Sequence, residues 1–271
     1  MRGPNSWGAV FFVVIAAAAG VFVEAGAPVP PAGTAEAAPP ASAVVLYVVD
    51  GDSFHARFPD GKAGGVRLIG VNAPEMTDER EDVRAWAFLA KRFAIHQLAG
   101  KKIKLEYDWE TRDAYGRLLA YVRLPGGERK LFNKLIIGRG FAYAFLKYPF
   151  REDYQREFRR AQQEAVREGR GLWRKDAPPE ITPAEAGNRL GDLAAVRFRC
   201  AEVKELRRYY ALIAREGGFQ VLVSKSCGLD LSPVSSWAGR RMVVSGIVEG
   251  APGRISIYVC FPIQIQTEGD G

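Results

Sequence analysis

The stretch Val44–Phe58, VVLYVVDGDSFHARF, contains two runs of strand-forming residues joined by a short polar turn. Valine and aromatic residues fill the runs Val44–Val49 and Ser53–Phe58, and Asp-Gly-Asp stands between them. β-Branched and aromatic residues favour strands, whereas Gly and Asp favour the tight turns that join antiparallel strands. The sequence therefore predicts a β-hairpin, which begins the folded part of the chain.

More strand-like runs follow the hairpin, and three helical stretches, each closed by a glycine, interleave with them. In the first helical stretch Trp86, Leu89, Ala90 and Phe93 recur with helical spacing, so we expect one face of this helix to be core. Five short strands in all suggest a small barrel. The three further strands are expected at Gly65–Val71, Lys102–Trp109 and Leu118–Leu124, and the helices at Glu81–Leu98, Leu131–Arg139 and Glu152–Arg167.

A Pro-rich segment at residues 176–189 predicts a linker, and the chain beyond it, residues 190–267, is rich in strands with little helix. The pattern indicates a second small barrel of the Greek-key oligonucleotide/oligosaccharide-binding (OB) type. The fold class is therefore mainly β with helices (α+β). The expected strands of this part are Ala194–Val203, Tyr209–Ala214, Phe219–Val223, Arg241–Val248 and Arg254–Ile265.

The N-terminal segment is expected to lie outside the fold. An apolar run from Trp7 to Val23 follows Arg2, and small residues come next, a pattern typical of an export signal at residues 1–27. An uncleaved membrane anchor is the alternative, since the run is near the short limit for a spanning helix. Residues 28–43, rich in Ala and Pro, predict a semi-extended linker. Both alternatives place the folded part outside the cytoplasm, as a secreted, periplasmic or outward-facing anchored protein.

The basic residues are concentrated in one part of the chain. Residues 44–175 carry 26 Lys and Arg against 18 Asp and Glu, whereas residues 176–271 carry 11 of each. A basic surface on one domain favours a polyanionic partner, although a solvated surface without a ligand gives the same count. All three cysteines, Cys200, Cys227 and Cys260, lie in the last third, where an exported location permits one disulfide. Only His55 and His96 are present, so a zinc site is not expected.

Three short clusters within residues 44–175 combine acidic residues, arginines and turn residues. Each one singly fits an ordinary turn or loop. They are Asp50-Gly51-Asp52-Ser53, then the segment from Arg67 to Glu75 that includes Asn72, Ala73 and Pro74, and finally Asp113-Ala114-Tyr115-Gly116-Arg117.

In this order and spacing the three clusters closely resemble the staphylococcal nuclease (thermonuclease) family. The resemblance extends from about Val44 to Trp173 and includes Gly140-Phe141-Ala142 and the closing GRGLW. It implies a nuclease domain at residues 44–175, folded as a five-stranded OB barrel with three helices. It also implies Ca²⁺-dependent cleavage of phosphodiester bonds, with DNA or RNA as the partner and no small-molecule cofactor. A membrane partner follows only if the N-terminal segment is retained.

The resemblance assigns a role to each residue of the clusters. The metal is placed on Asp52, Asn72 and the backbone carbonyl of Ala73, with Asp50 in the outer shell, because hard oxygen ligands suit Ca²⁺. Arg67 and Arg117 clamp the phosphate, since a guanidinium matches two of its oxygens at once. Glu75 is the candidate general base. Tyr115 is a candidate substrate contact.

Two positions depart from the family pattern, which has Asp where this chain has Asn72 and Thr where it has Ala73. The amide retains an oxygen but loses a charge, so we expect weaker metal binding with the same geometry. Because Asp52, Arg67, Glu75 and Arg117 are all retained, the sequence favours an exported, metal-dependent nuclease. The alternatives are a non-catalytic nucleic-acid-binding envelope protein with the same fold and an envelope scaffold. DNA against RNA preference, endo against exo action, oligomeric state and the role of the second barrel stay open.

Overall fold

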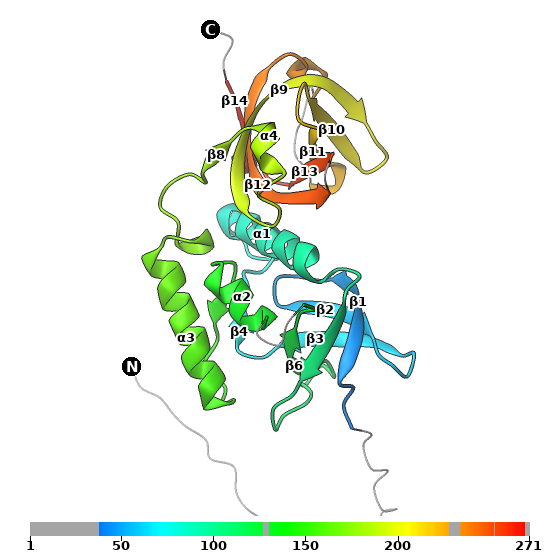
Figure 1. The fold of residues 1–271 in the computed structure, drawn as a ribbon, viewed down its shortest axis with the longest axis vertical. Helices are drawn as coiled ribbons and strands as arrows, with labels where there is room; N and C mark the ends of the chain where they lie inside the picture. Colours follow the sequence, from blue (N-terminus) through cyan, green and yellow to red (C-terminus); the bar gives the residue numbers. More distant parts are fainter. Residues whose placement is uncertain (1–37, 127–129, 228–233, 252, 269–271) are drawn as a thin grey trace, which may run out of the picture. The chain divides into compact units, whose positions relative to one another are not determined.

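The computed structural model describes residues 38–126, 130–227, 234–251 and 253–268 (Figure 1). The expected export segment at residues 1–27, and the linker as far as residue 37, lie outside the described residues. Pro39–Gly271 forms one compact unit. None of the helices in the described part of the chain is long and apolar enough to span a membrane.

Five strands close into the first barrel, which confirms the predicted architecture. Their order is β1 (Ser42–Val48), β2 (Ser53–Arg57), β3 (Ala63–Leu68), β6 (Leu118–Arg123) and β5 (Lys102–Glu106). The sheet closes because β1 pairs antiparallel with both β2 and β5. The pairing of β3 with β6 is parallel.

β4 (Val71–Asn72) and β7 (Tyr143–Ala144) form a short two-stranded sheet. In the sequence β4 follows β3 directly. We predicted a single strand over Gly65–Val71, but a turn at residues 69–70 divides it. The consequence is that Asn72 lies on a separate strand, directed by pairing with Tyr143 rather than by the barrel.

Three helices follow the predicted bounds closely: α1 (Glu81–Leu98), α2 (Phe132–Gly138) and α3 (Glu152–Arg167). The face of α1 that periodicity marks as core is buried, with Leu89, Ala90 and Phe93 inside the core of the first barrel. Burial of such a stripe, rather than intrinsic propensity, stabilises a helix in a folded protein.

The second barrel has the same strand order as the first. It is formed by β9 (Leu193–Glu205), β10 (Tyr209–Ala214), β11 (Phe219–Ser224), β13 (Arg254–Val259) and β12 (Arg241–Ala251). It closes because β12 also pairs with β9, and β11 with β13 is the parallel pair. The short strands β8 (Glu180–Ile181) and β14 (Ile265–Thr267) extend this sheet.

The segment predicted as a linker has structure of its own. It contains β8 and the short helix α4 (Pro183–Ala186), which Thr182 and Glu185 cap reciprocally. The predicted strand Arg254–Ile265 ends early, because Pro262 cannot donate to a ladder and opens the 3₁₀ turn η4 (Pro262–Gln264). The other 3₁₀ turns are η1 (Gly171–Trp173), η2 (Lys225–Cys227) and η3 (Val234–Trp237).

Helix α1 contacts both barrels. Its outer face carries Ala85 and Phe88, which pack with Cys260 and Phe261 of the second barrel, and the Phe88 and Phe261 rings meet edge to face. Ile247 of β12 belongs to the first barrel's core. The two barrels therefore share apolar contacts and are not joined by a flexible tether alone.

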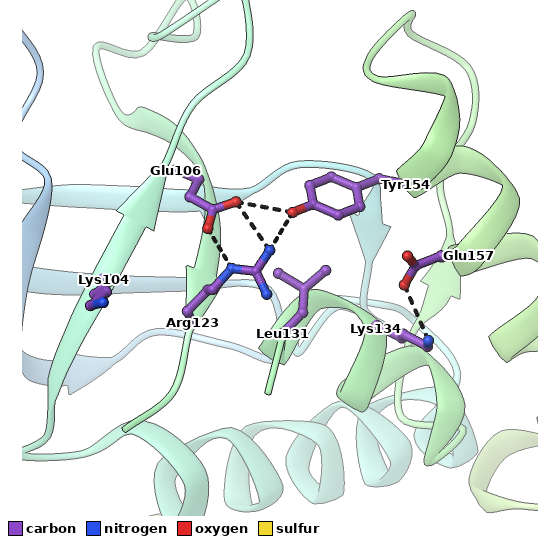
Figure 2. Close-up of a pocket in the computed structure, with 7 residues that line it drawn as sticks. All are labelled: Lys104, Glu106, Arg123, Leu131, Lys134, Tyr154 and Glu157. Carbon is purple, nitrogen blue, oxygen red and sulfur yellow. Dashed lines mark hydrogen bonds and ion pairs between the residues drawn. The ribbon is translucent and has the colours of Figure 1, made fainter. Parts of the chain in front are cut away.

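A polar cluster links the first barrel to α3 (Figure 2). Arg123 pairs with Glu106 through Nε and Nη2, and its Nη2 also donates to the Tyr154 hydroxyl at 2.6 Å. That hydroxyl donates in turn to Glu106 Oε2 at 2.9 Å. The cluster lines a cavity of about 580 Å³ whose other side holds the Lys134–Glu157 pair. Hydrogen bonds on every member make it a structural link between β5, β6 and α3.

The cysteines follow the expectation of a disulfide in the last third. Cys260 is disulfide-bonded, whereas Cys200 is a buried free thiol in β9. Burial raises the pKa of the Cys200 thiol. A thiol kept neutral and away from solvent behaves as an inert part of the core.

Candidate active site

The turn between β1 and β2 is held by the carboxylate of Asp50. Its Oδ1 accepts from the backbone N–H of Asp52 at 3.0 Å, from that of Ser53 at 2.7 Å and from the Ser53 hydroxyl at 2.8 Å. Asp50 thus fixes the turn, as Asp commonly does. Gly51 permits close packing, because a Cβ there would lie 2.7 Å from Ala73 Cβ and 3.0 Å from Ala90 Cβ of α1.

Asp52 is buried and is the residue on which the first two clusters converge. Only 2% of it is exposed. Its Oδ2 accepts from the backbone N–H of Ala73 at 2.6 Å, and its Oδ1 forms an ion pair with Arg67 Nη1. Arg67 also donates from Nη2 to Asn72 Oδ1 at 3.3 Å. The structure therefore brings together the four predicted residues Asp52, Arg67, Asn72 and Ala73.

The Asp52 carboxyl has an unusual pKa. Burial raises it to about 7; the positive charge of Arg67 opposes this rise, while the nearby Asp50 carboxylate adds to it. One guanidinium and one backbone N–H thus do not offset the cost of burying the charge. A second positive charge at this point would favour the ionised carboxylate.

The residues around Asp52 fit a hard divalent cation in the chemistry of their donors. A carboxylate, the Asn72 amide oxygen and the backbone carbonyl of Ala73 are all oxygen ligands, the kind that Ca²⁺ prefers. Arg67 contacts Asp52 Oδ1 and Asn72 Oδ1, so both side-chain oxygens lie within reach of a single positive charge. The described residues hold no group of three or more His, Cys, Asp or Glu side chains that could bind a metal.

The third cluster positions Arg117. Asp113 Oδ1 accepts from the backbone N–H of Tyr115 at 3.0 Å and of Arg117 at 2.9 Å, and Asp113 Oδ2 accepts from Arg117 Nε at 2.7 Å. Among the described residues nothing accepts a hydrogen bond from Nη1 or Nη2 of Arg117. The guanidinium lies 5.5 Å from the centre of the Tyr115 ring. Asp113 thus fixes the Nε edge of the guanidinium, and the edge formed by Nη1 and Nη2 is available to a ligand.

Parallel pairing of β3 with β6 places the two arginines on one face. Arg67 stands opposite Leu119 in the register. The Arg117 side chain packs over Gly65, since a Cβ at Gly65 would lie 3.0 Å from Arg117 Cγ. Side chains two residues apart on a strand share a face, so Gly65 and Arg67 do so. Arg117 therefore lies on the Arg67 side of the sheet.

A single pocket of about 520 Å³ is lined by Arg67, Asn72, Tyr115 and Arg117. Aromatic side chains that the sequence reasoning did not single out complete its wall; they are Trp109, Phe145, Tyr148 and Phe150. Trp109 and Tyr148 are more than half exposed. The signal for Phe145, Tyr148 and Phe150 was the aromatic-rich run FAYAFLKYPF at residues 141–150, which does not include Trp109. Exposed aromatic faces beside paired arginines suit a ligand that has both rings and phosphates.

The remaining predicted residues lie apart from this pocket. Asp52 and Ala73 are buried behind it, and Asp50 belongs to the turn. Glu75 is exposed, three residues beyond Asn72, and does not line the pocket. Within the described part of the chain its carboxylate makes no hydrogen bond or ion pair, although its backbone carbonyl accepts from Asp78. The role of Glu75 stays a prediction.

Comparison with known proteins identifies relatives of the first barrel. Residues 65–175 match the family model described as staphylococcal nuclease homologue. The chain is 37% identical over 134 residues to the thermonuclease of Staphylococcus intermedius, covering 49% of this chain and 77% of that protein. It is 34% identical over 129 residues to the thermonuclease of Staphylococcus hyicus, covering 48% and 73%. Endonuclease YhcR of Bacillus subtilis is 30% identical over 150 residues, 52% of this chain but 12% of that protein.

Proposed function

Because the chain belongs to the staphylococcal nuclease family, we propose that its first barrel is a metal-dependent nuclease that hydrolyses phosphodiester bonds of DNA, RNA or both. The observation that carries the proposal is the pocket lined by Arg67, Asn72, Tyr115 and Arg117. It combines two guanidinium groups with the amide of the oxygen-donor cluster around buried Asp52.

The two arginines bind and polarise the phosphate. Hydrolysis of a phosphodiester accumulates negative charge on the oxygens around phosphorus, and fixed positive groups stabilise it without reorganising. Asp113 holds Arg117 by Nε, which leaves its two terminal nitrogens to take two phosphate oxygens. Arg67 approaches from β3 on the same face. The aromatic wall, with Trp109 and Tyr148, supports stacking of the neighbouring bases.

A bound Ca²⁺ would be held by Asp52, Asn72 and the Ala73 carbonyl, and there it would add to the positive charge that the two arginines offer the phosphate. Asp50 keeps the turn that carries Asp52 in place. Glu75, exposed and without a protein partner in the described chain, is free to orient the attacking water and accept its proton.

Cleavage assays on single- and double-stranded DNA and RNA, with Ca²⁺ and then with EDTA, test the proposal on the full chain. Glu75→Gln should lower kcat about a hundredfold or more, because loss of a general base typically costs ~10²–10⁴ in rate. Glu79→Gln, a nearby exposed glutamate, is the matched control and should retain activity. Binding of nucleic acid without cleavage under every condition would favour the non-catalytic alternative.

The proposal assigns the activity to residues 44–175. A chain ending at Lys175 should cleave with Ca²⁺, since every proposed site residue precedes that point. It should also be less stable than the full chain, because Phe88 loses Phe261 and Arg92 loses Glu249. An inactive shortened chain beside an active full chain would show that the second barrel is part of the catalytic domain.

The proposal also places the protein outside the cytoplasm. The apolar run Trp7–Val23 supports export, and a disulfide-bonded Cys260 suits an oxidising compartment. Fractionation of cells producing the full chain, followed by mass measurement of the product, distinguishes a cleaved signal from a retained anchor. Activity confined to the cytoplasm would contradict this part of the proposal.

A further inference from the structure

Two Gly-Arg-Gly triplets, far apart in sequence, meet in the fold. Gly138-Arg139-Gly140 ends α2, and Gly169-Arg170-Gly171 follows α3. The backbones touch: Leu172 N–H donates to Gly140 O at 2.8 Å, and a Cβ on Gly140 would lie only 2.1 Å from Arg170 O. Since only glycine tolerates so close an approach, the triplets hold Arg139 and Arg170 near each other.

These arginines line a small pocket at the start of the second barrel. Its volume is about 180 Å³, and the charged residues around it are Arg139, Arg170, Arg174, Arg189 and Asp192. It shares no lining residue with the pocket around Arg117. It is therefore a separate cavity, and its lining is strongly basic.

Acidic groups offset only part of this charge. Arg139 Nη1 pairs with Asp192 at 2.7 Å, and Arg170 pairs with Glu168 while also donating from Nη1 to Gly138 O at 2.9 Å. Arg189 is exposed. Four arginines stand against these two carboxylates and that of Glu185, on which the charge of Arg189 also acts, so a positive surplus remains at the pocket.

Arg174 contributes a further guanidinium to the pocket lining. Its Nη1 donates to the Ala177 carbonyl at 3.0 Å, but its Nε is buried and meets no acceptor among the residues that the structure describes. A buried N–H without an acceptor costs free energy. The rest of the Arg174 side chain lines the pocket and adds its positive charge there.

We infer that this pocket binds a phosphate group in its monoester or inorganic form. Guanidinium forks match tetrahedral oxyanions, and a phosphomonoester carries about −1.5 to −2 charges near pH 7, opposite in sign to the surplus of the arginines. Small-molecule pockets usually measure ~300–1,000 Å³, so a cavity of about 180 Å³ takes a phosphate head but no nucleobase. The phosphate comes either free from solution or from the end of a nucleic-acid strand.

Calorimetric titration of the full chain with inorganic phosphate, in EDTA and at fixed ionic strength, tests this site. Arg174→Gln and Arg189→Gln should each weaken binding of one phosphate per chain at least tenfold. Arg160→Gln, on the exposed side of α3, should retain it. Unchanged affinity in Arg174→Gln and Arg189→Gln, or loss in Arg117→Gln alone, would overturn the inference.

Two further arms identify the source and exclude misfolding. Oligonucleotides with and without a 5′-phosphate are compared in EDTA: an advantage of the phosphorylated strand that Arg189→Gln removes identifies a strand end, and no such advantage identifies free phosphate. Arg189 is exposed, so Arg189→Gln should melt at the wild-type temperature without phosphate. A phosphate-induced rise in Tm should be lost in Arg189→Gln and kept in Arg160→Gln; an equal rise in both would contradict the site.

Discussion

The guanidinium of Arg92 in α1 forms a bidentate ion pair with Glu249 in β12, with both N–O distances 2.6 Å. The same guanidinium lies 3.6 Å from the centre of the Tyr258 ring. Only 15% and 10% of the two side chains are exposed. Burial raises the pKa of Glu249, and the positive charge of Arg92 opposes that rise. The attraction between Arg92 and Glu249 thus offsets the cost of burying each charge.

Removing one partner of this pair should strongly destabilise the protein. Arg92→Ala leaves Glu249 buried without its counter-ion, at a cost of about 3–5 kcal/mol in the free energy of unfolding. Urea denaturation measures the loss. Lys134→Ala is the matched control, because its pair with Glu157 is about half exposed and should cost no more than about 1 kcal/mol. Equal losses of unfolding free energy in the two variants would show that the buried Arg92–Glu249 pair stabilises the protein no more than an exposed pair does.

Replacing Arg67 should destabilise the protein more than replacing Arg117, although both replacements should lower activity. Arg67→Ala and Arg117→Ala should each lower kcat about a hundredfold or more, the usual cost of losing a charge-stabilising group. In EDTA, Arg67→Ala should also cost about 3 kcal/mol of stability, since it leaves buried Asp52 without its ion pair. Arg117→Ala should cost about 1 kcal/mol or less, because Arg117 is about a third exposed. Rate assays and urea denaturation on the same samples separate the two effects; retained kcat in either variant would contradict its proposed role.

Asn72→Asp should tighten metal binding. A carboxylate adds a negative charge where the amide gives only a dipole, and the gain should be about 1 kcal/mol or more at a partly solvated site. Titration of the cleavage rate with Ca²⁺ for both proteins measures the change. Asn188→Asp adds the same charge at an exposed position and should leave the Ca²⁺ requirement unaltered. A higher Ca²⁺ requirement in Asn72→Asp, or activity that survives EDTA, would exclude residue 72 as a ligand.

The Glu106–Arg123–Tyr154 cluster should make stability depend on acid pH. Burial acts to raise the pKa of Glu106, but the hydrogen bonds from Arg123 and Tyr154 outweigh it and hold that pKa below 4.5. A carboxylate whose pKa is lowered by folding stabilises the fold above its unfolded pKa, and this contribution is lost as pH falls through the folded value. The difference in unfolding free energy between wild type and Glu106→Gln should therefore shrink below about pH 4.5. Glu157→Gln removes only a pair that is about half exposed and should cost no more than about 1 kcal/mol of stability.

Local pattern was enough to predict the helices and most strands. The bounds of α1 and α3 followed from a periodic apolar face and a closing glycine, and Asp-Gly-Asp marked the first hairpin. The break at Pro262 and the helix within residues 176–189 were missed, because a proline-rich run does not show which short elements pack onto a barrel.

The candidate site was predictable only in part. The resemblance of the three clusters to the family predicted Asp52, Arg67, Asn72 and Arg117, which the fold brings together. The aromatic wall with Trp109 and Tyr148, and the Arg92–Glu249 pair, depend on contacts between residues far apart in sequence. The helix and strand periodicity of a local segment does not show such contacts, because they form only when distant segments pack together in the fold.

The parallel pairing of β3 with β6 also constrains how the protein acquires activity. Val66 and Leu118 pair across a segment of the chain that contains α1 and β5. Non-local pairings of this kind form slowly, because the entropy of loop closure is lost before the contact is gained. Secondary structure can therefore recover early in refolding while the two arginines are still apart. The return of the proposed cleavage activity would then mark closure of the barrel.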